Sequence, residues 1–359
     1  MDPNMTDSFS RKRTDNYVEH PLYTAEVVRI AALGDAKALA GKTILVTGAA
    51  GLIGTVLVEA LMEANRQGAD IRVIALDKDR PRSESRFRRH FGSPSFSFLE
   101  QDAKAPLPPD CRFDICVVAA SNTSPLDYAA HPVETALTNL LGAKNALDAA
   151  RRCGGRVLFC SSVEVYGNAR NEKTFREEDT GMLNLGNARS SYPESKRSAE
   201  ALCQCYHTEF GVHTNTARIC RVFGPTVLPG DTKAASQFIT NAVRGEKIVL
   251  KSDGLQFYSW LHVFDCVTAL LAIAAKGADG LSYNVADPSC DASLRDFAQF
   301  AADAAGTELV FDLPTEAEKR GYSKTTRAVM DASRLRTLGW KPAAGLADRI
   351  RQTVETMRQ

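Results

Sequence analysis

The residues best suited to chemistry lie in two short stretches, SSVEVYG at 161–167 and YPESK at 192–196. Tyr192 and Lys196 are spaced i and i+4, so a helix places them on one face. An ammonium beside a phenol favours the phenolate and lowers the tyrosine pKa toward neutrality. Such a tyrosine can take a proton from a hydroxyl while hydride leaves the same carbon. The pair therefore predicts coupled proton and hydride transfer.

SSVEVYG alternates apolar and polar residues, which is typical of the end of a buried strand. A carboxylate is unfavourable inside a buried strand. Glu164 is therefore either a surface acid at the end of the strand or part of an active site, and the alternation alone does not decide between them.

A glycine-rich turn supplies the second half of the chemistry. Gly48, Gly51 and Gly54 form T-G-x-x-G-x-x-G between an apolar run at 43–47 and a helical pattern that ends near Gly68. Glycines at such a turn let the backbone approach a pyrophosphate, which sits at the helix N-terminus. The placement between strand and helix predicts a dinucleotide site.

Two acids follow later strands. Asp77 ends the next apolar run, where a carboxylate accepts hydrogen bonds from the adenosine ribose and repels a 2′-phosphate, so NAD is favoured over NADP. Arg80 and Arg82 nearby keep NADP open. Asp102 follows the third run and either reaches the adenine or is a solvated turn acid.

Short apolar runs alternate with helical patterns over the first half of the chain, which predicts an α/β fold with a Rossmann-type, doubly wound parallel sheet. The arginine-rich segment 77–95 is interpreted as a solvated connection. We expect an N-terminal extension at 1–41, partly disordered with one helix over 23–40, a dinucleotide domain at 42–222 that also receives about 261–288, and a smaller substrate lobe at 223–260 and 289–359. The expected strands are 43–47, 71–76, 96–99, 113–121, 156–162 and 213–219, and the expected helices are 134–151 and 192–210.

Bulk composition excludes several classes of function. The chain has 359 residues, 44% of them hydrophobic and 24% charged, with a net charge of +1, which indicates neither nucleic acid nor membrane as a partner. The N-terminus lacks the apolar core of a secretory signal. The nine scattered cysteines indicate small core residues in a reducing cytoplasm rather than disulfides. Their spacing favours no metal site.

Taken together, these motifs resemble the extended short-chain dehydrogenase/reductase family, and specifically its nucleotide-sugar epimerases, dehydratases and decarboxylases. The resemblance covers roughly 42–345 and rests on TGAAGLIG, SNTSPLDYAAHPVETALTNLLGAKN, SSVEVYG, YPESK, RICRVFGP and MDASRLRTLGWKP. It implies a tightly held NAD that accepts hydride from carbon 4 of a nucleotide-bound hexose. It also implies a homodimer formed by the helix of Tyr192 and the helix near Asn139.

The resemblance assigns roles position by position. Tyr192 corresponds to the base and Lys196 to its partner on the nicotinamide ribose. Ser162 corresponds to the residue that hydrogen-bonds the reacting hydroxyl, with Ser161 as the second candidate, while Tyr166 is structural or a wall of the sugar pocket. The implied cofactor contacts are Gly48, Gly51, Leu52, Ile53, Gly54, Asp77, Asp102, Ala119, Ala120, Ser121, Tyr192 and Lys196. The implied substrate contacts are Ser121, Thr123, Ser162, Glu164, Arg221, Lys233, Gln237, Tyr258 and Arg327.

Glu164 bears on the type of reaction. The resembling dehydratases and UDP-glucuronate decarboxylases carry glutamate here, whereas 4-epimerases usually carry a small or neutral residue. A ketone at carbon 4 acidifies the proton on carbon 5, and a carboxylate can remove it. Glucose dehydratases usually have an aspartate just before this glutamate, where this chain has Val163. The stretch SNTSPLDYAAHPVET looks most like the decarboxylases.

Two positions depart from the family pattern. Tyr258 stands where an arginine usually contacts the nucleotide diphosphate, and Arg221 stands where asparagine is usual. Arg221 either supplies the missing cation to the diphosphate, because guanidinium suits phosphate, or forms a salt bridge with a neighbour while the substrate is of another kind.

The sequence therefore predicts an NAD-dependent enzyme that forms a 4-keto nucleotide sugar and then decarboxylates or dehydrates it with Glu164. The alternative within the family is 4- or 5-epimerisation through the same intermediate. Outside it, a non-catalytic NAD-binding protein and a simple carbonyl reductase are the competing hypotheses. The intact set of Ser162, Tyr192 and Lys196 speaks against the first, and the sugar-lobe segments after Phe223 speak against the second.

Overall fold

The computed structural model describes residues 16–167, 174–313 and 326–358. Its main sheet has seven parallel strands in the order β11-β7-β5-β4-β1-β2-β3. This doubly wound parallel sheet confirms the predicted fold class. The strands are β1 (Thr43–Thr47), β2 (Arg72–Asp77), β3 (Phe96–Glu100), β4 (Ile115–Val118), β5 (Arg156–Ser162), β7 (His213–Ile219) and β11 (Ser282–Val285).

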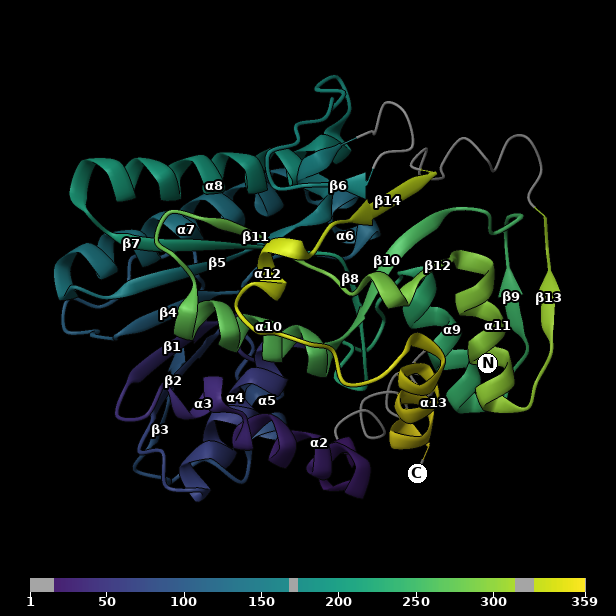
Figure 1. The fold of residues 1–359 in the computed structure, drawn as a ribbon, viewed down its shortest axis with the longest axis horizontal. Helices are drawn as coiled ribbons and strands as arrows, with labels where there is room; N and C mark the ends of the chain where they lie inside the picture. The colour runs from purple at the N-terminus through teal and green to yellow at the C-terminus, as the bar shows by residue number, and fades with distance from the viewer. Residues whose placement is uncertain (1–15, 168–173, 314–325, 359) are drawn as a thin grey trace.

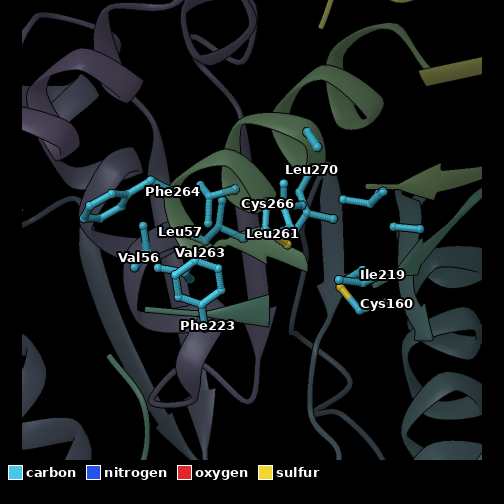
Figure 2. Close-up of a cluster of buried hydrophobic side chains, with 14 of the residues drawn as sticks. Val56, Leu57, Cys160, Ile219, Phe223, Leu261, Val263, Phe264, Cys266 and Leu270 are labelled. Atoms are coloured by element: carbon cyan, nitrogen blue, oxygen red, sulfur yellow. The ribbon is translucent and has the colours of Figure 1, made fainter. Parts of the chain in front are cut away.

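Helices cover both faces of this sheet, so its strands are apolar on both sides. Leu45 and Phe159 pack toward α7 (Pro132–Cys153) and α8 (Ser191–Phe210). Their neighbours Val46 and Leu158 pack on the opposite face, toward α4 (Leu52–Arg66) and α10 (Val263–Lys276). Figure 1 shows α7 and α8 side by side above the sheet and α4 with α10 below it. Figure 2 shows the core on the α4 and α10 face of the sheet, where side chains of these helices meet those of β5, β7, β8 and β10.

A second group of elements lies beyond the carboxyl ends of the main strands. A small sheet has the order β12-β10-β14-β6, with β8 also paired to β10, and β9 pairs separately with β13. Figure 1 shows β9, β13 and helices α9, α11 and α13 gathered at one end of the molecule. The bounds are β6 (Thr174–Phe175), β8 (Arg221–Phe223), β9 (Ile248–Leu250), β10 (Phe257–His262), β12 (Asp291–Ser293), β13 (Leu309–Phe311), β14 (Arg327–Met330), α9 (Ala234–Arg244), α11 (Leu294–Ala305), α12 (Ser333–Arg336) and α13 (Leu346–Met357).

The N-terminal extension differs from the single helix expected over 23–40. It forms α2 (Pro21–Ala32) and α3 (Gly34–Lys37), separated by Leu33 in an extended conformation (φ −64°, ψ 148°). Tyr23 and Ile30 are fully buried, and α2 packs along α4. The helical pattern was therefore recognised but its break was missed, and the predicted disordered lead at 1–13 lies outside the described residues.

A buried ion pair joins the two ends of the chain to the core. Arg349 on α13 donates to both carboxylate oxygens of Asp265 on α10, at 2.9 and 3.0 Å, and both side chains are 2% exposed. The same guanidinium reaches Glu26 on α2 at 2.8 Å. Ala343 N–H also donates to Asp265 at 3.0 Å. Burial raises the pKa of Asp265 even though Arg349 opposes the shift, so this carboxylate needs its partners.

We expect Arg349→Met to lower the free energy of unfolding by about 3–5 kcal/mol, because it leaves a buried carboxylate without its main cation. Urea unfolding followed by circular dichroism measures the loss. Arg351→Met on the same helix is the matched control, since Arg351 is 64% exposed and its surface pair with Asp348 is worth about 0–1 kcal/mol. Equal losses in the two variants would contradict the interpretation.

Candidate active site

The glycine-rich turn between β1 and α4 is built without room for side chains. A Cβ on Gly48, whose φ is +66°, would lie 2.7 Å from the Cα of Ala120, and one on Gly54 would lie 2.4 Å from the carbonyl oxygen of Gly48. Gly51 is the N-cap of α4 and offers no side-chain cap. The first N–H groups of α4, at Leu52 and Ile53, are therefore available to an anion at the helix N-terminus.

Two side chains hold this turn in place. Asp77, at the end of β2, accepts the Ala50 N–H at 3.0 Å and the Asp79 N–H at 3.0 Å. Arg86 donates through Nη1 to the carbonyl of Ala50 at 3.0 Å and to Oγ1 of Thr55 at 2.9 Å. Each carboxylate oxygen of Asp77 keeps a second lone pair for a ribose hydroxyl.

Arg86 corrects the interpretation of 77–95 as a solvated connection. The segment contains α5 (Arg80–Phe87), capped by Asp79, and Arg86 is only 1% exposed. The composition suggested solvation because arginine is seldom buried unless it is paired. Its partners here are backbone carbonyls some 35 residues earlier, which local composition cannot indicate.

The other predicted cofactor residues lie along the carboxyl edge of the main sheet. Ala119 and Ala120 follow β4 and donate their N–H groups to the backbone and side chain of Thr47. Asp102 follows β3 and accepts the Lys104 N–H at 2.9 Å. Asp102 also lies 3.4 Å from the ammonium of Lys104, so it is a turn acid, partly neutralised, at the predicted edge.

The structure brings Tyr192, Ser162 and Lys196 together where α8 crosses the end of β5. Tyr192 shares a side-chain hydrogen bond with Ser162. The Lys196 ammonium donates to the Cys160 carbonyl at 2.8 Å and lies 5.9 Å from the centroid of the Tyr192 ring. All three side chains are buried, at 7%, 9% and 2% exposure respectively.

Burial governs the ionisation of this group. It raises the pKa of Tyr192 well above its usual value, with the Glu164 carboxylate adding to the shift and the Ser162 hydrogen bond opposing it. Burial also lowers the pKa of Lys196 to about 8. The expected lowering of the tyrosine pKa by Lys196 is therefore absent from this arrangement of the described residues, in which the ammonium is turned to a backbone carbonyl.

A chain of hydrogen bonds connects the predicted cofactor residue Ser121 to the start of α8. The Ser121 hydroxyl donates to Asn139 Oδ1 at 2.7 Å, and Asn139 Nδ2 donates to Ser195 Oγ at 2.9 Å. Ser195 in turn donates to the carbonyl of Tyr192 at 2.9 Å. This relay holds the backbone of Tyr192 relative to α7 and the β4 edge, and neither Asn139 nor Ser195 was among the predicted site residues.

Ser161 and Tyr166 belong to a separate polar network behind the site. The Ser161 hydroxyl donates to Glu200, which pairs with Arg218 at 2.7 Å. The Tyr166 hydroxyl donates to Asn284 at 2.6 Å and accepts from Arg218 at 3.0 Å. The structural prediction for Tyr166 thus agrees with its contacts, and Ser161 is directed to Glu200 rather than to Tyr192.

Glu164 lies in the short 3-10 helix that follows β5 (Val163–Tyr166) and is 43% exposed. Its carboxylate is 3.4 Å from Nη2 of Arg221. The guanidinium of Arg221 stacks 3.6 Å from the centroid of the Tyr258 ring. The charge of Glu164 raises the pKa values of Tyr192, Tyr128 and Tyr258. Glu164 is therefore in the same cluster as the predicted base.

Tyr128 is the aromatic residue of this cluster that sequence reasoning missed. It lies on α6 (Pro125–Ala130), and its ring stacks on Tyr192 with centroids 5.3 Å apart and an interplanar angle of 16°. Burial raises the pKa of Tyr128. Its position in the tyrosine-containing stretch SNTSPLDYAAHPVET was the available signal, but nothing local indicated a partner 64 residues later.

The remaining predicted substrate residues fall into two other places. Lys233 donates to Thr123 at 3.2 Å and pairs with Asp231 at 2.8 Å, while Gln237 is exposed one turn into α9. These join the loop after β4 to the start of α9. Arg327 is placed differently: it stacks 5.0 Å from the Phe257 ring, and burial raises the pKa of Asp291 to about 6 while the charge of Arg327 opposes that shift.

Comparison with known proteins gives the class of this fold and site. A profile of the NAD dependent epimerase/dehydratase family matches residues 44–286. UDP-glucuronic acid decarboxylase 5 from Arabidopsis thaliana is 34% identical over 245 residues, which are 68% of this chain and 70% of that protein. UDP-glucuronic acid decarboxylase 1 from Xenopus tropicalis is 30% identical over 319 residues, covering 89% and 72%.

Among solved structures, dTDP-glucose 4,6-dehydratase from Streptomyces venezuelae superposes with a TM-score of 0.74 at 24% identity, covering 88% of this chain and 97% of the other. The chain belongs to the NAD dependent epimerase/dehydratase family. It is an enzyme of the extended short-chain dehydrogenase/reductase type, as the motifs predicted.

Lys196→Met is expected to stabilise the nucleotide-free protein at pH 7 by about 1–3 kcal/mol, because it removes a buried charge at the loss of one hydrogen bond. The folded pKa of Lys196 is about 8 against a usual 10.5. The unfolded chain therefore binds more protons between those values, and wild-type stability rises with pH across that window.

The stability gain of Lys196→Met should accordingly shrink as the pH rises from 8 to 10.5. Urea unfolding at a series of pH values measures it. Lys247→Met is the control, since Lys247 is 65% exposed and its removal should leave the stability nearly unchanged. A gain that does not vary with pH would contradict the assignment.

Proposed function

We propose that this protein binds NAD and a nucleotide sugar, oxidises the sugar at carbon 4, and decarboxylates the resulting 4-keto hexuronate. The observation that carries the proposal is the cluster of Tyr192, Ser162 and Lys196 with Glu164 at the end of β5. The UDP-glucuronic acid decarboxylases that this chain resembles support the choice of reaction and of nucleotide.

The residues present fit NAD. The backbone at Gly48 and Gly54 leaves a cradle that a Cβ would fill, and the open helix N-terminus of α4 suits a pyrophosphate. We propose Asp77 for the adenosine ribose, where its charge would repel a 2′-phosphate, Asp102 for the adenine, and Ala119, Ala120 and Ser121, which follow β4, as further cofactor contacts. When bound, NAD accepts a hydride from carbon 4 and later returns it.

The side chains then have distinct roles. Tyr192 takes the proton of the carbon 4 hydroxyl, and Ser162 hydrogen-bonds the same oxygen. With NAD bound, Lys196 would turn from the Cys160 carbonyl to a ribose hydroxyl, and its positive charge would lower the pKa of Tyr192 that burial has raised. Glu164 steers the loss of the carboxylate from carbon 5.

Dehydration is supported less well than decarboxylation. Val163 is buried, at 4% exposure, and stands where a dehydratase needs an acid to expel the carbon 6 hydroxyl. Epimerisation through the same 4-keto sugar remains the alternative.

We assign 42–222 with about 261–288 to the cofactor, and 223–260 with 289–359 to the nucleotide sugar. The pairing of β11 with β7 supports the first assignment. We propose that the nucleotide end of the substrate contacts Thr123, Lys233 and Gln237. Arg327 is proposed to line the substrate lobe farther from the substrate. Within the part of the chain that the structure describes, no group of three or more His, Cys, Asp or Glu side chains could hold a metal ion.

We further propose a cytoplasmic homodimer formed by α7 and α8. All nine cysteines are free thiols and six of them are buried, which supports a reducing compartment. The side chains of Val133 and Leu137 on α7 are exposed, at 70% and 41%, which supports a partner on that face. Within the described residues, none of the helices is both long and apolar enough to span a membrane. Light scattering of the purified protein tests the dimer.

Purified protein should convert UDP-glucuronate to a product lighter by carbon dioxide when a panel of UDP-, GDP-, CDP- and dTDP-linked hexoses and hexuronates is followed by mass spectrometry. Tyr192→Phe should lower turnover by about 10²–10⁴-fold, because it removes the proton acceptor, while the circular dichroism spectrum stays unchanged. Loss of water would indicate dehydration, and an unchanged mass with a new NMR spectrum would indicate epimerisation. Retained turnover in Tyr192→Phe would refute the base.

Glu164→Gln should separate oxidation from the later step. Transient reduction of NAD, followed by absorbance, should persist with UDP-glucuronate, while product formation falls by about 100-fold or more because the carboxylate acting at carbon 5 is gone. Glu209→Gln at an exposed position of α8 is the control and should behave as wild type. Loss of NAD reduction in Glu164→Gln alone would assign Glu164 to the first step.

A further inference from the structure

Arg221 carries a donor group that no other described residue uses. Among the described residues, its buried Nη1 has no hydrogen-bond partner, whereas Nη2 lies 3.4 Å from Glu164. A buried donor left unpaired costs about 1–3 kcal/mol. A guanidinium offers donors in a planar fork suited to a carboxylate or a phosphate, so the open Nη1 points to an anionic ligand.

The guanidinium is held in a fixed orientation. It stacks 3.6 Å from the Tyr258 ring centroid, and Arg221 on β8 is in register with Trp260 on β10. Tyr258 and Trp260 are two residues apart on β10 and so lie on the same face of that strand. A cation stacked on a ring is attracted by the face of the ring. One edge of the fork therefore goes to Glu164 and the other is left open.

The position of Arg221 decides between the two anions of a nucleotide hexuronate. Glu164, its ion-pair partner, donates its own N–H to Ser162 at 3.2 Å and influences the pKa of Tyr192. Carbon 4 must reach Tyr192 and Ser162, and carbon 5 with its carboxylate is bonded directly to carbon 4. The diphosphate is attached at carbon 1, across the sugar ring. The cation beside Glu164 is therefore on the carboxylate side.

From this juxtaposition we propose that Arg221, positioned by Tyr258, binds the carbon 6 carboxylate of the substrate and restricts the enzyme to nucleotide hexuronates. The inference rests on the proposed function and differs from the expected contact with the diphosphate. Without Arg221, the substrate carboxylate would face the Glu164 carboxylate, and two like charges at close range repel. Arg221 lies against Glu164 and removes that repulsion.

The proposal also specifies which kinetic constant Arg221 controls. Decarboxylation of the 4-keto sugar breaks the bond between carbons 5 and 6, and its electron pair passes to the carbon 4 oxygen as an enolate, with carbon dioxide leaving and a proton returning to carbon 5. Negative charge thus moves away from Arg221 toward Tyr192 and Ser162. An interaction that weakens in the transition state aids binding but does not accelerate the step. Arg221 is a specificity residue.

The test compares three ligands by titration calorimetry with the NAD-loaded enzyme: UDP-glucuronate, UDP-glucose and UDP. Arg221→Gln should weaken the binding of UDP-glucuronate by about 10–100-fold, which is the value of a hydrogen bond to a charged group. The affinities for UDP-glucose and UDP should stay within about twofold of wild type. In turnover, KM for UDP-glucuronate should rise while kcat does not fall. Equal weakening of all three ligands would assign Arg221 to the diphosphate and overturn the proposal, as would no weakening at all.

Tyr258 variants provide the matched control. Tyr258→Phe keeps the ring and should retain the preference for UDP-glucuronate, whereas Tyr258→Ala removes the platform and should lose it. A kcat that falls in proportion to kcat/KM in Arg221→Gln would contradict a binding role. Failure of the proposed function looks different: wild-type enzyme that prefers UDP-glucuronate yet releases no carbon dioxide would leave the carboxylate site intact and refute decarboxylation.

Discussion

The candidate site depends on the packing of α8 against the end of β5, where the buried Lys196 ammonium donates to the Cys160 carbonyl. This packing places Tyr192, one turn earlier on α8, against Ser162, two residues later on β5. The Ser121–Asn139–Ser195 relay secures the same point from α7, and the Ser161–Glu200–Arg218 network secures it from behind. Because a buried charge costs stability at neutral pH, this geometry reflects function rather than maximal stability.

The parts of the molecule that sequence could predict are those determined over short distances. The bounds of β5 and β7 and the face shared by Tyr192 and Lys196 follow from alternation and helical spacing. The fold class follows from apolar runs separated by helices, because parallel strands need crossovers. The parts that could not be predicted join distant residues. Arg86 is buried only because the Ala50 and Gly51 carbonyls receive it, and Tyr128 belongs to the site only because α6 stacks it on Tyr192.

The charge distribution around the site separates a neutral region from a paired one. Tyr192 and Tyr128 lie in a buried layer where the neutral phenol is favoured. Beside them, Glu164 and Arg221 form a partly exposed ion pair with an N–O distance of 3.4 Å. Oxidation at carbon 4 needs a phenol, Tyr192, that loses its proton only when the positive charge of Lys196 comes close. A substrate carboxylate next to carbon 4 needs a cation that is already present.

The positions of Arg221 and Tyr258 explain each other. The resemblance to the family leads one to expect an arginine at 258 and an uncharged side chain at 221, and this chain has the cation on β8 and the uncharged ring on β10. Because β8 and β10 are paired neighbours, moving the charge by one strand keeps it on the same surface but brings it to Glu164. A second arginine at 258 would place two guanidinium groups together, so a ring that stabilises Arg221 is the residue type that a relocated cation requires. The two departures from the family pattern are therefore one structural change, and its effect is to shift positive charge toward the reacting end of the sugar.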